Sequence, residues 1–419
     1  MSRRLDFPSL AAVALLAAAV ACGGDKATGT NTSTQNGAGC AGVTATAASS
    51  PATSLAVVGK GVVADRYTAE VAVRGTCAYT TTWGHRAAVG NAVKIWNVAG
   101  NDPVLVDSLI VSGAVTLGDV QVSDDGKLLV VATEFSPGSI VVYDLSDPAH
   151  PHQRSRFSSA NTAPGVHTAE VQRVGGVLYA FLSVDPGQGF AARLVIVSLA
   201  DPAAPHEVWS QAMGNPYVHD VFVRDGVLFT ALWNDGLEIW DIGGAGHGGS
   251  VTNPVPLGIV ATVGGHAHNV WWLHDPTTGA KRYAVVGEES PSQLGLTSSG
   301  DVHVIDVSDF TNPREVAFYH GGDNVGTHNF SVDESAGVLY AAFYNGGVRA
   351  LDVRGDLGSC TAAQRAADGR CDLSLMNREL ARGLSASGSV YVWGVQVEGD
   401  YVYASDMLNG LWKLGKVVR

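Results

Sequence analysis

One phrase recurs along this chain about every fifty residues: an apolar strand that ends near an aspartate, then a turn, then a second strand-like run. Clear copies are 140–148 (IVVYDLSDP), 194–202 (LVIVSLADP) and 302–309 (VHVIDVSD). Two further strand-like runs precede each copy, and hairpin turns such as Asn409-Gly410 join some of them. This repeat constrains the fold more than any single motif, because each unit buries its apolar face only against its neighbours.

Aligning the copies places one polar residue of each unit in a common column, except in the last unit, where the residue is glycine. The column consists of Glu70, Asp119, Glu170, Asp220, Asn269, Asn329 and Gly394, spaced by 49, 51, 50, 49, 60 and 65 residues. Seven units of this length predict an all-β fold, a seven-bladed β-propeller of four-stranded blades, whose radial closure leaves no long sheet edge exposed. The longer steps predict insertions in the fifth and sixth units. The insertion in the sixth blade is expected at about residues 356–388, with a helix over Leu373–Leu384.

The two ends of the repeat region complement each other. The last unit ends at Arg419 with about three strands, whereas the strand-like segment 54–59 precedes the first unit and has no partner there. We therefore expect an N-terminal strand to close the last blade. The composition agrees with a large β-rich core: 51 of the 419 residues are glycine, 46% are hydrophobic and 16% are charged, which excludes global disorder.

The repeated phrase resembles the LVIVD repeat of bacterial surface β-propellers. The segment 194–205 carries the resemblance most clearly, and 141–148 and 304–309 follow the same pattern. The copies at 237–242 and 348–353 lack the Ser-Asp-Pro turn. The resemblance covers roughly residues 54–419 and implies the propeller fold, but it implies little about a reaction.

The N-terminus resembles a bacterial lipoprotein signal. Two arginines precede an apolar stretch over residues 10–20, and small residues lead to Cys22, although Ala19 stands where the family usually has leucine. The apolar stretch is too short to remain as a membrane-spanning helix. The resemblance implies that residues 1–21 are removed and that Cys22 is lipidated, which would anchor the chain in a membrane. The alternative is an ordinary secretory signal with an incidental cysteine.

The remaining chain divides into a tether and the repeat domain. Residues 22–53 are rich in Gly, Ser and Thr and are expected to form a flexible tether, which leaves 54–419 as the propeller. We expect an exported protein, anchored in the outer membrane of a bacterium on its periplasmic or its surface face. Gly23 and Gly24, rather than an acidic residue, follow the anchor and argue against retention in the inner membrane.

Four cysteines remain once Cys22 is set aside. An exported chain meets an oxidising compartment, so this even number predicts disulfides. Cys360 and Cys371 bracket a short loop and are the expected pair; Cys40 with Cys77 follows by elimination.

Five histidines fall at equivalent places in the repeat. His219, His268 and His328 lie in the column just before the polar one, and His167 and His266 lie two residues earlier. Because rotation relates the blades, we expect these side chains to converge at one mouth of the central channel. Neutral imidazoles ligate Cu, Zn or Fe, and neighbouring carboxylates can orient them, so the first three histidines are candidate ligands of one transition metal ion.

Two other readings of the same mouth stay open. One is a small-ligand site, with His167, Glu170, Asp220, His266, Asn269 and Asn329 as its candidate residues. The other is structural polar packing around a wet channel. Glu288 and Glu289 could add carboxylates to the mouth, but their place in an insertion is more typical of a solvated loop.

The formal net charge of −13 argues against nucleic acid as a partner. We expect a lipid-anchored, monomeric, extracytoplasmic module that binds or scaffolds a small-molecule, polysaccharide or protein ligand at the cell surface. The alternative is a metal-dependent extracytoplasmic enzyme, an oxidase or a hydrolase, that uses the axial histidines. The fold alone does not decide between them.

Overall fold

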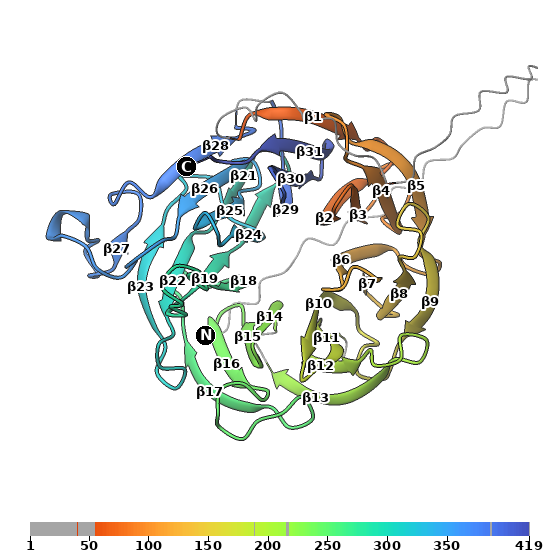
Figure 1. Ribbon diagram of the computed structural model, residues 1–419, viewed down its shortest axis with the longest axis horizontal. Helices are drawn as coiled ribbons and strands as arrows, with labels where there is room; N and C mark the ends of the chain where they lie inside the picture. Colours follow the sequence, from red (N-terminus) through yellow and green to blue (C-terminus); the bar gives the residue numbers. More distant parts are fainter. Residues whose placement is uncertain (1–39, 41–54, 188, 215–217, 386–387, 419) are drawn as a thin grey trace, which may run out of the picture. The chain divides into compact units, whose positions relative to one another are not determined.

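In the computed structural model, the described residues are Cys40, 55–187, 189–214, 218–385 and 388–418. They belong to the unit Ala38–Arg419, whereas the predicted signal, Cys22 and all of the predicted tether except Cys40 lie outside them. Seven sheets of four or five strands form the blades. Figure 1 shows these blades arranged around a central axis, with the chain passing from blade to blade in sequence order. The prediction of a seven-bladed β-propeller is confirmed.

Blades one to four each contain four antiparallel strands, in chain order from the axis to the rim. Blade one contains β2 (Tyr67–Arg74), β3 (Cys77–Trp83), β4 (Ala92–Asn97) and β5 (Val104–Ile110). Blade two contains β6 (Thr116–Val122), β7 (Leu128–Glu134), β8 (Ser139–Asp144) and β9 (His152–Phe157). Blade three contains β10 (Val166–Val174), β11 (Val177–Val184), β12 (Ala192–Ser198) and β13 (His206–Gly214). Blade four contains β14 (Asp220–Arg224), β15 (Val227–Ala231), β16 (Leu237–Asp241) and β17 (Val255–Val260).

Blades five to seven add the irregular elements. Blade five contains β18 (Ala267–Trp272), β19 (Tyr283–Glu288), β22 (Val302–Asp306) and β23 (Arg314–Tyr319), with β27 (Cys371–Asp372) parallel to β23. A hairpin of β20 (Ser290–Gln293) and β21 (Thr297–Ser299) lies between β19 and β22 in the chain. Blade six contains β24 (Phe330–Asp333), β25 (Val338–Ala342), β26 (Val348–Asp352) and β28 (Glu379–Gly383). Blade seven contains β29 (Val392–Glu398), β30 (Tyr401–Asp406), β31 (Gly410–Gly415) and β1 (Val57–Val62).

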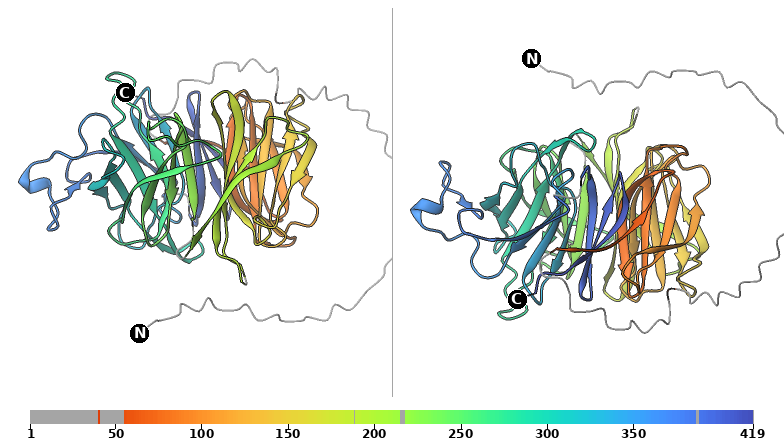
Figure 2. Two further views of the ribbon diagram at one scale, coloured as in Figure 1. Left: turned by 90° about the horizontal axis from the view of Figure 1, so that it is seen from below. Right: turned by 90° about the horizontal axis from the view of Figure 1, so that it is seen from above.

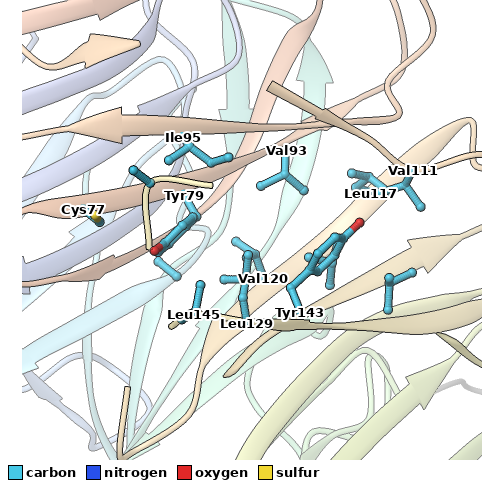
Figure 3. Close-up of a cluster of buried hydrophobic side chains, with 14 of the residues drawn as sticks. Cys77, Tyr79, Val93, Ile95, Val111, Leu117, Val120, Leu129, Tyr143 and Leu145 are labelled. Carbon is cyan, nitrogen blue, oxygen red and sulfur yellow. The ribbon is translucent and has the colours of Figure 1, made fainter. Parts of the chain in front are cut away.

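The middle strands are apolar because both of their faces are buried. Every residue of β7 is buried, whereas most residues of the rim strand β9 are exposed. Figure 3 shows how Tyr79, Val93 and Ile95 of blade one pack with Leu129 and Tyr143 of blade two. The core is therefore a series of layers between neighbouring blades.

The aspartates of the repeated phrase are structural. Asp144 accepts a hydrogen bond from the backbone N–H of Ser146 at 2.7 Å, and Asp306 accepts one from Ser308 at 3.0 Å. This local bond closes the turn that leads to the rim strand.

The N-terminal strand closes the ring. β1 pairs antiparallel with β31, with Val62 opposite Gly410, so the first described strand is the rim strand of the last blade. Lys413 of β31 donates to the carbonyls of Val98 and Gly100 at 2.8 and 2.7 Å, which joins blade seven to blade one. The predicted closure is confirmed.

Both predicted disulfides are present. Cys40 is bonded to Cys77 with a Cα–Cα distance of 5.0 Å, and Cys360 to Cys371 with a Cα–Cα distance of 5.9 Å.

The helix expected over Leu373–Leu384 is wrong. The described part of the insertion contains one short 3-10 turn, η1 (Ala362–Gln364), and projects from the rim beside β23 and β27 (Figures 1 and 2). Glu379–Gly383 forms β28 and pairs with β26 as the fourth strand of blade six. This tertiary pairing overrides the helix-forming composition of the segment. No helix among the described residues is long and apolar enough to cross a membrane.

Candidate functional site

Seven side chains, one from each blade, form a closed ring around the propeller axis. This axial ring consists of Trp83, Glu134, His167, His219, His268, His328 and Trp393. Trp83 and Glu134 end second strands (β3 and β7), whereas the other five lie at or just before the start of inner strands. The blades thus bring together residues up to 310 positions apart in the sequence.

The histidine side of the ring is a continuous series of ring contacts. The centroids of His167 and His219 are 4.3 Å apart, those of His219 and His268 4.3 Å, and those of His268 and His328 4.0 Å. His328 then contacts Trp393 at 4.3 Å. The predicted convergence of the histidine column is therefore present in the structure.

The ring closes through a carboxylate and a pair of indoles. Trp393 lies 5.8 Å from Trp83, whose Nε1 donates to Glu134 at 3.1 Å. The other oxygen of Glu134 lies 3.1 Å from Nδ1 of His167, and Asp185 lies 3.8 Å from the same nitrogen. Burial alone would lower the pKa of His167, but the two carboxylates raise it to about 10, so this imidazole is a cation held between Glu134 and Asp185.

Glu289 lies against the three remaining histidines. Its carboxylate oxygens are 3.5 Å from Nε2 of His219, 3.8 Å from Nε2 of His268 and 3.7 Å from Nε2 of His328. The hydroxyl of Tyr344 donates to the same carboxylate. We call His219, His268, His328 and Glu289 the axial cluster.

The imidazoles of the axial cluster are buried, and burial favours their neutral form. Each of the three imidazole side chains is 3% exposed, and burial holds their pKa values below the usual range. Burial opposes ionisation of Glu289, but its imidazole neighbours and the donating hydroxyl of Tyr344 keep its pKa below the usual value, so the carboxylate is charged. Ligand atoms of His219, His268 and Glu289 all lie within 4.8 Å of one another, as the ligands of one metal ion must.

The polar column predicted from the repeat forms a second layer directly along the axis. A cavity of about 320 Å³ lies on the axis. Its wall contains residues of the axial ring, four acids of the polar column (Glu70, Asp119, Glu170 and Asp220) and two amides of the same column (Asn269 and Asn329). We call the four acids the carboxyl layer. Burial, reinforced by the charge of Asp119, raises the pKa of Glu70 to about 8 and that of Asp220 to about 7.

Gly394 is the seventh member of this column, and its lack of a side chain lets Glu70 reach across blade seven. A Cβ at position 394 would collide with Oε1 of Glu70. The amide of Asn329 in blade six donates to the other oxygen of Glu70. Glu70 therefore occupies the place that a seventh side chain would take.

Among the residues predicted for a small-ligand mouth, His167, Glu170, Asp220, Asn269 and Asn329 line the axial cavity, and His266 does not. His266 stacks on Trp233 at 4.9 Å rather than joining the axial ring, and Trp233 in turn stacks on His219 at 4.9 Å. His219, His268 and His328 are buried, and the last two also form part of the cavity wall.

Two acids that follow second strands also contact the ring histidines, and sequence reasoning did not select them as site residues. Asp185 follows β11, and Glu289 follows β19 at the equivalent place in blade five. Both point to ring histidines. Aligning the ends of the second strands, and not only the starts of the inner strands, would have selected these residues.

A family profile identifies one repeat directly. The LVIVD repeat profile matches residues 390–412, which contain β29, β30 and the start of β31. This chain is a β-propeller that carries an LVIVD repeat. The match lies in blade seven, whereas the copies that carried the resemblance in the sequence lie in blades two, three and five.

Solved structures agree with the fold. U3-55K is 12% identical, with 87% of this chain and 99% of that chain covered and a TM-score of 0.59. The Cps50 (Swd1) propeller domain of Myceliophteria thermophila is 11% identical, with 85% and 98% covered and a TM-score of 0.55. Sqt1 of Saccharomyces cerevisiae is 11% identical, with 84% and 83% covered and a TM-score of 0.51. At these identities the similarity shows the fold alone, and no curated protein matches the chain.

Proposed function

We propose that this protein is a lipid-anchored, extracytoplasmic binding propeller whose axial cavity takes a cationic ligand. The observation that carries the proposal is the wall of that cavity. It contains the four acids of the carboxyl layer and Glu134, which already holds the imidazolium of His167, and no lysine or arginine among the described residues that line it. Propellers typically act as binding or scaffolding modules, which agrees with this role.

Buried carboxylates without a positive partner are unfavourable, because they lose hydration without gaining a compensating charge. The raised pKa values of Glu70 and Asp220 mean that, without a ligand, bound protons neutralise these carboxylates. A bound cation would displace those protons. Affinity for the cation should therefore rise as the pH increases through about 7 to 8.

A calorimetric titration of the full mature chain tests the proposal. The probes are putrescine as an organic dication, Zn²⁺ as a metal ion and glutarate as an anion. We expect at least one of the two cations to bind and glutarate not to bind. Glu170→Gln with Asp220→Asn should weaken cation binding by about tenfold or more, whereas Asp400→Asn, at an exposed turn, should not change it. Equal binding by the cavity variant and by Asp400→Asn would contradict the proposal.

The anchor is tested separately in cells. If Cys22 carries the lipid, the wild-type chain takes up labelled palmitate and stays with the membrane fraction, and Cys22→Ala does neither. Palmitate labelling of Cys22→Ala would contradict lipidation at this residue. The enzymatic alternative, an oxidase or a hydrolase, stays a prediction, because the geometry does not name a substrate.

A further inference from the structure

The Nε2 atoms of His268 and His328 lie 3.8 and 3.7 Å from Oε2 of Glu289, which is too far for direct hydrogen bonds of about 2.7–3.2 Å. The Nε2 atom of His219 lies 3.5 Å from the other oxygen, Oε1. A tetrahedral ion with bonds of about 2.1 Å to nitrogen and oxygen separates neighbouring ligand atoms by about 3.4 Å. The observed nitrogen–oxygen separations are slightly longer than this, and ligand atoms of His219, His268 and Glu289 all lie within 4.8 Å of one another.

The tautomer of His328 agrees with this arrangement. Its Nδ1 lies 2.7 Å from the carbonyl oxygen of Trp393, which can only accept a hydrogen bond. In the neutral ring Nδ1 is therefore the donor, and Nε2 carries a lone pair that faces the Glu289 carboxylate. Two acceptors facing each other repel unless a cation lies between them. A backbone carbonyl that fixes the far nitrogen in this way is common behind histidine ligands of metals.

The surroundings of Glu289 also favour a cation. Its side chain is 11% exposed, and no lysine or arginine among the described residues forms an ion pair with it. The nearby imidazole of His167 faces Glu134 and Asp185 instead. A buried carboxyl group packed among imidazoles and the phenol of Tyr344 is a place where a bound cation would be stabilising.

From these observations we infer that a divalent transition-metal ion binds within the axial cluster, with His219, His268 and Glu289 as its ligands and His328, whose Nε2 lies 3.7 Å from the same carboxylate, as the fourth. The inference rests on the proposed cation-binding function and names the ion and its ligands. Three imidazoles favour Zn²⁺, Cu²⁺ or Fe²⁺ over Mg²⁺ and Ca²⁺, which prefer oxygen ligands. Tyr344 and the carbonyl of Trp393 are positioning groups, because each holds a ligand without facing the ion.

The axial cavity offers a route to this site. His268 and His328 form part of its wall, and the carboxyl layer lines the same space. The carboxyl layer and two of the cluster's imidazoles therefore border the same space. The metal ion is thus the cationic ligand of the proposed function, and it binds where the axial cavity borders the histidines.

Metal titration of the full mature chain, stripped of metal beforehand, tests the inference. We expect one Zn²⁺ or Co²⁺ ion per chain, and bound Co²⁺ should show the intense visible absorption of a four-coordinate site. His268→Ala and Glu289→Gln should each weaken binding by more than about 100-fold, and Tyr344→Phe by about 10- to 100-fold. His150→Ala removes an exposed imidazole and should leave affinity unchanged.

A measurement on the wild-type chain keeps the test independent of whether the variants fold. X-ray absorption of the bound zinc should show only nitrogen and oxygen neighbours at about 2.0–2.1 Å, with the scattering pattern of imidazole rings. Sulfur neighbours, a first shell without imidazole, or equal affinity in Glu289→Gln and His150→Ala would overturn the site. Binding of putrescine without binding of Zn²⁺ or Co²⁺ would overturn the metal and leave the proposed function standing, whereas failure of all three cations would contradict both.

Discussion

Gly394 is the one member of the polar column that has no side chain, and Glu70 fills the space that it leaves. Gly394→Ala forces a methyl group against the carboxylate of Glu70. We expect this to lower the free energy of unfolding by about 1–3 kcal/mol, as overpacking does elsewhere. Denaturant unfolding measures the change. Gly100→Ala is the control, because a Cβ there has open space, with its nearest neighbour at 3.9 Å.

A double-mutant cycle separates this collision from a general loss of stability. Shortening the acid in Glu70→Ala removes the atoms that the new methyl group meets. The two substitutions together should therefore cost less than the sum of their separate effects. If the two effects on the free energy of unfolding simply add, the absence of a side chain at Gly394 does not serve to accommodate the Glu70 carboxylate.

The pH dependence of stability follows from the carboxyl layer. Burial raises the folded-state pKa of Glu70 to about 8, above its usual value of 4.5. The folded state therefore binds a proton more tightly, and this contribution is complete below about pH 4.5 and is lost as the pH rises to about 8. In metal-free buffer, the melting temperature of the wild-type chain should fall over this range relative to that of Glu70→Gln. Parallel curves for the two proteins would contradict the raised pKa.

At the scale of single residues, the repeat spacing predicted which side chains share the axis. His219, His268 and His328 were found because they fall in one column of the alignment. Glu289 was set aside as a loop residue, because the insertion after β19 conceals its equivalence to Asp185. Its burial against the histidines depends on the blade-to-blade packing, which no local pattern in the sequence encodes.

Among the elements, β31 carries the contacts that join the last blade to the first. Lys413 is 2% exposed and donates to two carbonyls of blade one. Lys413→Met keeps the length of the side chain but leaves both buried carbonyls without this donor, and should lower the free energy of unfolding by about 1–3 kcal/mol. Lys127→Met, whose side chain is 79% exposed, should change it by less than about 0.5 kcal/mol. Equal unfolding curves for the two variants would show that Lys413 does not stabilise the contact between the last blade and the first.

The elements also show what local sequence can predict. The middle strands could be located because both of their faces are buried and their residues are uniformly apolar, as in β7. The rim strand β28 could not be located in this way, because its residues alternate between partly exposed and exposed and its composition favours a helix. Its pairing with β26, which lies across the insertion in the chain, decides its structure.

At the scale of the whole molecule, radial closure turns a linear repeat into one site. Residues from four successive blades supply the axial cluster and its nearest neighbour His167. The propeller fold alone implies a polar axis; the specific chemistry comes from the residues that each blade contributes to it. The disulfide from Cys40 to Cys77 joins the one described residue of the predicted tether to blade one.

The most direct test of this account is an anomalous difference map from crystals of the full mature chain soaked in zinc, recorded on both sides of the zinc absorption edge. The account predicts a single strong peak on the propeller axis, within about 2.0–2.2 Å of the Nε2 atoms of the three clustered histidines and an oxygen of Glu289. A peak elsewhere on the surface with none on the axis would contradict it.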